Sequence, residues 1–392
     1  MGANGGSTDS GTPQSRPLKL TGEPLNREPP VKQLLSRLNH FMNWFRATTD
    51  FQHSFLTEDG AYDRNHGPIP QIDRSTHTIK VDGAVGKTLS LNIDDLATSF
   101  PQHEVVCALQ CAGNRRHTMR TRLKEVDGID WGDGAIMNCS WRGPRLRDVL
   151  MAASPKLDSG HVAFACHQQE TQNDSWYGGS IELERALRGE ANVLLALERN
   201  SKPLSPKHGA PIRVIVPGVA GARSVKWLDR ITVQEQESTN HYHKHDYKIL
   251  PEEAKNAKEA EKYWDKVPPL QDMPINSVII SPQPDETVIV DTDGTIEVSG
   301  YAVPGGADGP VVKVEVSTDV EGPWTEAGLQ GEQSKWSWVI WKARIEVEKG
   351  TGKKLFSRAI DKGGNQQTAS PVWNLRGVRY NGYGESNNIT MG

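Results

Sequence analysis

The pattern of the sequence changes at about Pro274, and this change most limits the folds that the chain can adopt. From there onward, short runs of alternating apolar and polar residues, such as TIEVSGYAV and VVKVEVSTD, are separated by glycine-rich turns such as VPGGADGP and DKGGN. Period-two alternation is typical of strands that bury one face, and no helical period interrupts it. We therefore expect residues 274–392 to form an immunoglobulin-like β-sandwich of about 115 residues.

The preceding part of the chain mixes two kinds of pattern. Strand-like runs such as HTIKVDG, EVVCALQC, HVAFACH, PIRVIVPG and RITVQEQ alternate with helical or loop segments such as GPRLRDVLMAA and SIELERALRG. Such alternation is typical of a mixed α+β domain. We assign residues 31–250 to this domain, so the fold class expected for the chain is α+β.

Three further segments complete the expected organisation. Residues 1–30 are rich in Gly, Ser, Pro and Asn, which predicts a flexible tail. Residues 31–45 place apolar side chains on one face of a 3.6-residue period, which predicts an amphipathic helix. Residues 251–273 begin with a charged run of helix-forming residues, PEEAKNAKEAEKYWD, and we interpret them as the linker between the domains.

Bulk properties exclude several classes of protein. The chain has 392 residues and a formal net charge of -4, so the basic run after Cys111 is local and nucleic acid is not the expected partner. No apolar run is long enough to cross a membrane, and the first residues lack the apolar core of a secretory signal. We expect an intracellular soluble protein, with cytoplasm, peroxisome and mitochondrion all open. With only 4 cysteines, reduced thiols are the default.

One cysteine stands out among the four. Cys111 ends a predicted strand directly before AGNRR, so its sulfur is expected near Arg115 and Arg116. Positive charge favours the thiolate, which binds a soft metal or attacks an electrophile. The residues alone leave a buried structural thiol as the favoured alternative, and we assign Cys107, on the same side of that strand, to the core.

Cationic residues recur in loops punctuated by glycine and proline. A guanidinium group matches tetrahedral oxyanions and phosphates in a bidentate way, so several such loops indicate a large anionic ligand. Solvated surface arginine is the alternative for each one. The loops carry Arg64 with His66, Arg115 with Arg116, His208 with Arg213, Arg223 with Lys226, and Arg376.

The segment NHYHKHDYK places three histidines at alternate positions. On a strand, His241, His243 and His245 would present their imidazoles to one face, where a metal could bind. Apart from Asp246, which follows His245, the segment offers no acidic or cysteine partner. We therefore favour a solvated polar segment over a metal site here.

Six motifs, in their order and spacing, resemble those of the eukaryotic sulfite oxidases, which are molybdenum-cofactor enzymes. The resemblance covers about residues 50–378. The motifs are RNHGPIP from Arg64, LQCAGNRR from Leu109, YGGSIELERAL from Tyr177, HGAPIRVIVPGVAGARSVKWL from His208, DYK from Asp246 and VWNLRGV from Val372.

The resemblance implies a role for each matching residue. Cys111 would bind molybdenum through its thiolate. The molybdopterin and its phosphate would be held by Tyr62, Arg64, Asn65, His66, His208, Arg213, Ser224, Val225 and Lys226. The substrate pocket would be lined by Arg64, Arg116, Trp131, Tyr247 and Arg376. One departure concerns the basic residue that the family usually has a few positions before Trp131: this chain has Asp127 there, with Lys124 the nearest cation.

The implied reaction is oxygen-atom transfer that converts sulfite to sulfate, followed by reoxidation in one-electron steps. The C-terminal domain, residues 274–392, would form a homodimer. Residues 1–50 are too few for the haem domain of animal members, so we expect no haem and favour dioxygen over a small redox protein as acceptor. Two alternatives stay open. A nitrate reductase would share the molybdenum domain but replaces the residues equivalent to Tyr247 and Arg376, and a non-catalytic binding protein would carry a degenerate site.

Overall fold

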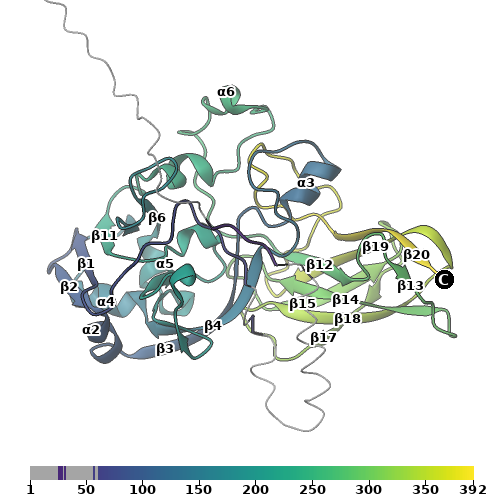
Figure 1. Ribbon diagram of the computed structural model, residues 1–392, viewed down its shortest axis with the longest axis horizontal. Coiled ribbons are helices and arrows are strands. Elements are labelled where there is room, and N and C mark those ends of the chain that lie inside the picture. The colour runs from purple at the N-terminus through teal and green to yellow at the C-terminus, as the bar shows by residue number, and fades with distance from the viewer. Residues whose placement is uncertain (1–24, 30, 32–55, 58–60) are drawn as a thin grey trace, which may run out of the picture.

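The computed structural model describes residues 25–29, 31, 56, 57 and 61–392 (Figure 1). The helix predicted for residues 31–45 lies outside the described residues, apart from Val31. Of the predicted tail, residues 25–29 are described and contact the folded domain. The expected α+β fold class is confirmed, because strands and short helices alternate before about residue 250 and strands alone follow Asn276.

A five-stranded sheet forms one half of the N-terminal domain. Its order is β2-β1-β11-β5-β6, and β1 pairs with β11 in parallel while the other neighbours are antiparallel. Helices α2, α4 and α5 add Leu96, Leu150 and Leu183 to its fully buried apolar core. The elements are β1 (Thr78–Gly83), β2 (Leu89–Asn92), α2 (Ile93–Thr98), α4 (Leu146–Ala153), β5 (His161–Cys166), β6 (Tyr177–Glu182), α5 (Leu183–Leu187) and β11 (Arg230–Gln234).

A second group of strands forms the other half of this domain and carries the sequence around Cys111. It comprises a sheet of order β3-β4-β8-β9 and the antiparallel pair of β7 and β10. The predicted strand that ends at Cys111 is β3, and Cys107 in it is fully buried in the core as expected. The elements are β3 (Gln102–Gln110), α3 (Arg116–Arg122), β4 (Ile136–Pro144), β7 (Leu194–Ala196), β8 (Glu198–Arg199), β9 (Lys202–Pro203) and β10 (Arg213–Ile215).

Single helical turns connect these strands and the start of the C-terminal domain. They include three 3₁₀ turns and one π-helix. Helix α6 is the only part of the expected helical run at 251–265 that is α-helical, because turns surround it on both sides. The elements are η2 (Gly189–Ala191), η3 (Pro206–His208), η4 (Gly221–Arg223), η5 (Tyr242–Asp246) and α6 (Ala257–Ala260).

The C-terminal domain is the expected sandwich of two sheets. One has the order β12-β14-β18-β17 and the other β13-β20-β19-β15-β16. Between them, Val298, Trp341, Leu355 and Ile389 are fully buried. The strands are β12 (Asn276–Ser281), β13 (Thr287–Val288), β14 (Thr295–Val303), β15 (Val311–Ser317), β16 (Thr325–Glu326), β17 (Gly328–Gln330), β18 (Val339–Glu346), β19 (Gly350–Asp361) and β20 (Gly384–Met391).

Arg115 joins the loop after Cys111 to the sandwich. Its guanidinium group is buried and donates to Asn276 Oδ1 at 2.8 Å, to the Gly382 carbonyl at 2.6 Å and to the Tyr383 carbonyl at 2.7 Å. Figure 1 shows α3, which begins at the next residue, beside the boundary between the two domains. The two domains are therefore held together directly behind the cysteine loop.

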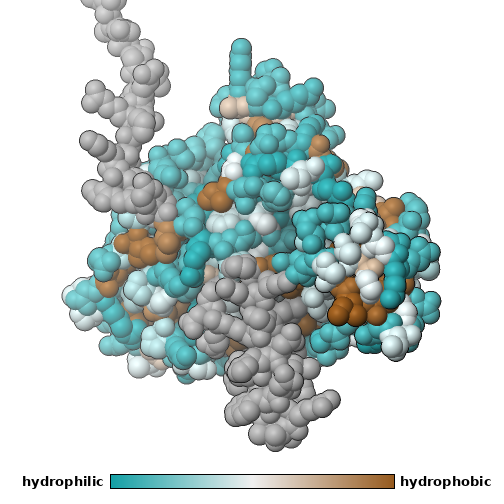
Figure 2. All heavy atoms as spheres, turned by 45° about the vertical axis from the view of Figure 1, so that its right-hand side comes forward, coloured by the Kyte–Doolittle hydropathy of each residue, from teal (hydrophilic) through white to brown (hydrophobic). Residues whose placement is uncertain are grey.

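The surface agrees with a protein whose apolar side chains are mainly internal. Figure 2 shows a largely hydrophilic face with small apolar patches. Within the described ranges, no helix combines the length and apolar character needed to span a bilayer.

Replacement of Ile389 by alanine tests the unexpected contribution of the last strand. Ile389→Ala should lower the free energy of unfolding by about 2–5 kcal/mol, because it opens a cavity between the sheets. The measurement is denaturant unfolding followed by tryptophan fluorescence. Ile289→Ala is the matched control: that side chain is 82% exposed, so the expected change is within about 0.5 kcal/mol. Equal effects of the two variants would contradict the core assignment of β20.

Candidate active site

The thiol of Cys111 lies where two cavities meet. Cys111 follows β3, its N–H donates to the Ala135 carbonyl at 2.9 Å, and its side chain is buried. Both cavities are lined by Arg64, Cys111 and Tyr247. The sulfur is therefore available from both sides to whatever the two cavities hold.

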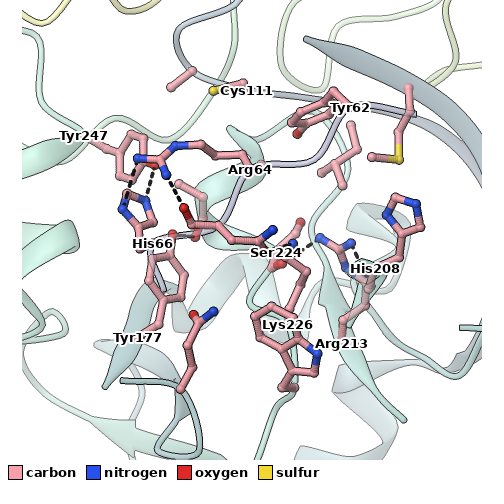
Figure 3. Close-up of a pocket in the computed structure, with 18 residues that line it drawn as sticks. Tyr62, Arg64, His66, Cys111, Tyr177, His208, Arg213, Ser224, Lys226 and Tyr247 are labelled. Carbon is pink, nitrogen blue, oxygen red and sulfur yellow. Dashed lines mark hydrogen bonds between the residues drawn. The ribbon is translucent and has the colours of Figure 1, made fainter. Parts of the chain in front are cut away.

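The larger cavity encloses about 610 Å³, part of which is open to solvent. Figure 3 shows Cys111, Arg64 and Tyr247 toward one side of it, and Lys226 and Arg213 toward the other. Eight of the predicted cofactor residues line this cavity: Tyr62, Arg64, Asn65, His66, His208, Arg213, Ser224 and Lys226. Val225 does not, because its side chain is fully buried in the hydrophobic core.

Two basic residues, the buried Arg213 and the half-buried Lys226, lie at the side of the larger cavity away from Cys111. Arg213 donates to the carbonyls of His208 at 3.1 Å and Ser224 at 2.9 Å, and Lys226 Nζ donates to the Lys207 carbonyl at 3.0 Å and to Asn65 Oδ1. Burial lowers the pKa of Arg213 to about 10 and also lowers the pKa of Lys226 well below its usual value. A bound anion would offset this cost of burying positive charge.

The smaller cavity, of about 300 Å³, contains all five residues predicted for substrate binding. Its cations are Arg64, Arg116 and Arg376, and Asp246 is the one carboxylate in its lining. Arg376 forms an ion pair with Asp246. Trp131 completes the wall, and its buried Nε1 has no hydrogen-bond partner among the residues that the structure describes. Counted without Cys111, the lining thus carries a net charge of +2, from three cations and one carboxylate.

Backbone carbonyl groups hold two of the three guanidinium nitrogens of Arg116. Its Nη1 donates to the Ile129 carbonyl at 2.7 Å and its Nε to the Arg376 carbonyl at 3.1 Å. A Cβ atom at Gly128 would lie 2.8 Å from the Arg116 guanidinium carbon, and one at Gly377 would lie 2.7 Å from its Cγ. Both glycines also have positive φ, so larger residues there would displace Arg116.

Lys124 does not supply a cation to this cavity. Its Nζ lies 4.0 Å from the centre of the Trp373 ring, and Lys124 is not in the cavity lining. Asp127 is exposed and is not in the cavity lining either. The cations in the lining of the smaller cavity are therefore Arg64, Arg116 and Arg376.

His66 and Tyr247 form a hydrogen-bonded pair whose direction follows from Arg64. Arg64 Nη2 lies 3.1 Å from His66 Nδ1, and His66 Nε2 lies 2.8 Å from the Tyr247 hydroxyl. Burial lowers the pKa of His66 well below its usual value, so the ring is neutral. Because a guanidinium only donates, Nδ1 must accept and Nε2 must carry the proton. His66 then donates to Tyr247, whose own O–H stays free to donate into the cavities.

The histidine segment differs from its predicted form. Residues 242–246 form the π-helix η5, and the prediction of a solvated segment is wrong for His243, which is fully buried. Burial lowers the pKa of His243 to about 2, and Ser180 contacts its Nε2 through Oγ at 3.3 Å. His241 and His245 stack at 5.0 Å between ring centres. In the described part of the chain, no group of at least three His, Cys, Asp or Glu side chains is placed to hold a metal ion.

Sequence reasoning missed several residues of the two cavities. Tyr177 and Gln169 line the larger cavity, and Asp246 lines the smaller one. Tyr177 and Asp246 each begin a motif that was already singled out, YGGSIELERAL and DYK, so the signal was present beside the predicted residues. Gln169 lies in no such motif.

The residues around Cys111 fit a soft metal held by an anionic organic cofactor. A single thiolate is a soft ligand for the metal. At the far side of the larger cavity, the buried Arg213 Nε has no hydrogen-bond partner within the described residues, and the half-buried Lys226 has a lowered pKa. These donors suit a phosphate or another oxyanion group. The donor set therefore matches a molybdopterin better than a bare metal ion.

Comparisons with known families and proteins agree with this donor set. The family described as oxidoreductase molybdopterin binding domain matches residues 66–242, and the family described as Mo-co oxidoreductase dimerisation domain matches residues 267–388. The chain is 39% identical to the mitochondrial sulfite oxidase of Homo sapiens over 377 residues, which cover 93% of this chain and 64% of that protein. It is 36% identical to the sulfite oxidase of Arabidopsis thaliana over 407 residues, which cover 96% and 95%.

Two further similarities set limits on the comparison. The NAD(P)H nitrate reductase of Hordeum vulgare is 35% identical over 382 residues, covering 93% of this chain but 41% of that protein. The solved structure of the sulfane dehydrogenase SoxCD from Paracoccus pantotrophus superposes with a TM-score of 0.70 at 24% identity, covering 87% of this chain and 84% of that one. This last similarity shows the fold alone. The chain spans 64% of the length of the human protein.

Proposed function

This chain belongs to the family of molybdopterin-binding oxidoreductases that includes the sulfite oxidases, and we propose that it oxidises sulfite to sulfate. One observation carries the proposal: Cys111 lines both a large cavity that holds Arg213 and Lys226 and a small cavity whose other charged residues sum to a net charge of +2. The first suits an anionic cofactor and the second suits a small dianion. The similarity to sulfite oxidases over most of the chain supports the same reaction.

The residues of the larger cavity would hold the cofactor. Cys111 would bind molybdenum, and Arg213 and Lys226 would bind the phosphate of the molybdopterin. His208 and Ser224 hold Arg213 in place through their carbonyl groups. When bound, the molybdenum centre supplies the oxygen atom and accepts the two electrons that sulfite gives up.

The three arginines of the smaller cavity would hold sulfite and then sulfate. They are fixed by protein contacts before any anion arrives, since Arg116 donates to carbonyl groups, Arg376 pairs with Asp246 and Arg64 contacts His66. Preorganised donors of this kind stabilise charge without the cost of reorientation. Tyr247 would donate its free O–H to the bound anion, and burial raises the pKa of Tyr247, which keeps this proton on the phenol.

Nitrate reduction is the competing reaction, because a nitrate reductase is also a relative. The charge of the smaller cavity favours sulfite, since nitrate carries a single negative charge. Tyr247 and Arg376, the two residues that the nitrate reductases are expected to replace, both line this cavity.

Molybdenum analysis addresses the other alternative, a degenerate binding protein. Protein from a host that makes the cofactor should contain about one molybdenum atom per chain, and metal-free protein would overturn the proposal.

For the electron acceptor we propose dioxygen, with hydrogen peroxide as the product. The resemblance found in the sequence implies dioxygen as the acceptor of plant-type sulfite oxidases, and the match to the sulfite oxidase of Arabidopsis thaliana covers 95% of that protein. An oxygen electrode should record sulfite-dependent oxygen uptake with one peroxide formed for each sulfite. Reduction of cytochrome c without oxygen uptake would instead identify a redox protein as the acceptor.

We further propose that the C-terminal domain forms a homodimer, as its match to a dimerisation domain supports.

A further inference from the structure

Residues Leu25 to Pro29, which we call the strap, lie across the walls of the site. At one end, the Leu25 carbonyl accepts from Asn65 Nδ2 at 2.7 Å, and Asn26 Oδ1 accepts from the Asn65 N–H at 3.0 Å and from Arg64 Nη1 at 3.2 Å. The strap therefore contacts a substrate arginine and a neighbouring cofactor residue directly.

The middle of the strap pairs with the chain directly before Arg64. Arg27 and Asp63 exchange two backbone hydrogen bonds of 2.8 Å, and Arg27 Nη2 lies 3.1 Å from Asp63 Oδ2. Asp63 is 1% exposed, so this ion pair is largely shielded on one side. These contacts fix the strap in register with residues 63–65.

The other end of the strap holds the loop that carries Trp131. The carboxylate of Glu28 accepts the N–H of Gly132 at 2.7 Å with one oxygen and the N–H of Gly134 at 2.6 Å with the other. A Cβ atom at Gly134 would lie 2.5 Å from the Pro29 carbonyl oxygen, so glycine is required for this approach. Burial raises the pKa of Glu28, and the N–H groups of Gly132 and Gly134 oppose that rise. The loop therefore stabilises the ionised form of this carboxyl group.

The same loop supports Arg116. The Gly132 carbonyl accepts the Arg115 N–H at 2.7 Å, and the Trp131 carbonyl accepts the His117 N–H at 2.8 Å. The Ile129 carbonyl accepts Arg116 Nη1. Residues 129–134 thus fix both the backbone on either side of Arg116 and its guanidinium group. No other carboxylate in the described ranges is seen to accept the Gly132 and Gly134 amides.

We propose that Glu28 is a positioning residue for anion binding: through Gly132 and Gly134 it holds the loop that sets Arg116 and Trp131, while Asn26 holds Arg64 from the same strap. The strap thereby fixes two of the three substrate arginines relative to each other. Glu28 touches neither cavity, so it acts through these residues alone. The proposal rests on the proposed function, because it assigns the strap to affinity for sulfite.

Glu28→Gln in the molybdenum-loaded enzyme tests the role. An amide accepts with one oxygen only, so one of the two N–H contacts is lost. Loss of a charge-assisted hydrogen bond should raise the KM for sulfite roughly tenfold. The kcat should change by less than about twofold, because the lost interaction would stabilise the bound substrate and the transition state equally. Hydrogen–deuterium exchange at Gly132 and Gly134 should become faster in the same variant.

Glu198→Gln is the matched control. Glu198 pairs with Arg142 on the surface and lines neither cavity. Because its replacement by glutamine removes the same charge, the KM and the exchange rates of this variant should match those of the wild type. The affinity for sulfate, measured by calorimetry, should fall in Glu28→Gln and tests the strap even if sulfite proves not to be the substrate. Unchanged exchange in Glu28→Gln would overturn the proposal, and so would faster exchange with unchanged sulfate affinity and unchanged KM.

Discussion

Cys111→Ser is expected to abolish sulfite-dependent reduction of ferricyanide while leaving the fold intact. Cys111 is the one cysteine that lines the cavities, and its sulfur lies where they meet. A serine hydroxyl is nearly the same size, so packing is preserved. It is a hard, protonated ligand in place of a soft thiolate, so the metal would lose its protein bond.

The control for this variant is Cys166→Ala. Cys166 is buried in β5 and lines neither cavity. It should lose some stability and keep its activity. Activity retained by Cys111→Ser, with bound molybdenum, would refute the assignment of Cys111 as the metal ligand.

Arg376→Met is expected to raise the KM for sulfite by roughly 10- to 100-fold. The change removes one of the three cations of the smaller cavity and leaves Asp246 without its ion-pair partner there. The net charge of the lining falls from +2 to +1, and a charge-assisted contact to the anion, each worth about 1.5–3 kcal/mol, is lost. Steady-state kinetics over a range of sulfite concentrations gives the value.

Arg344→Met is the matched control for Arg376→Met. Arg344 lies on the sandwich surface beside Asp291 and Asp293 and lines neither cavity. Its KM should equal that of the wild type. An unchanged KM in Arg376→Met would remove Arg376 from anion binding.

Local patterns in the sequence predicted much of the fold. Strand-like runs in the sequence identified β14, β15, β18 and β19. The last strand, β20, was not predicted, since its residues GESNNITM carry few apolar side chains and gain their place by pairing with β19 and β13. Tertiary pairing, and not local propensity, determines this strand.

The candidate site was predicted through motifs. The predictions that were wrong or missing concern contacts between segments that are distant in the sequence. Val225 sits inside a motif, yet its side chain turns into the core. His243 is polar in sequence but buried against Ser180, which lies 63 residues earlier. Glu28 and its partner glycines are separated by more than 100 residues, so no spacing rule connects them. Resemblance identified the chemistry, whereas only the structure shows what supports it.

The most direct test of the whole account is a parallel assay of sulfite oxidation and nitrate reduction on one preparation of molybdenum-loaded protein. With ferricyanide as the acceptor, sulfite should be oxidised, and with a reduced viologen as the donor, nitrate reduction should be far slower. Nitrate reduction without sulfite oxidation would contradict the proposed substrate. The absence of both activities in fully loaded protein would contradict the proposal that the chain is such an enzyme.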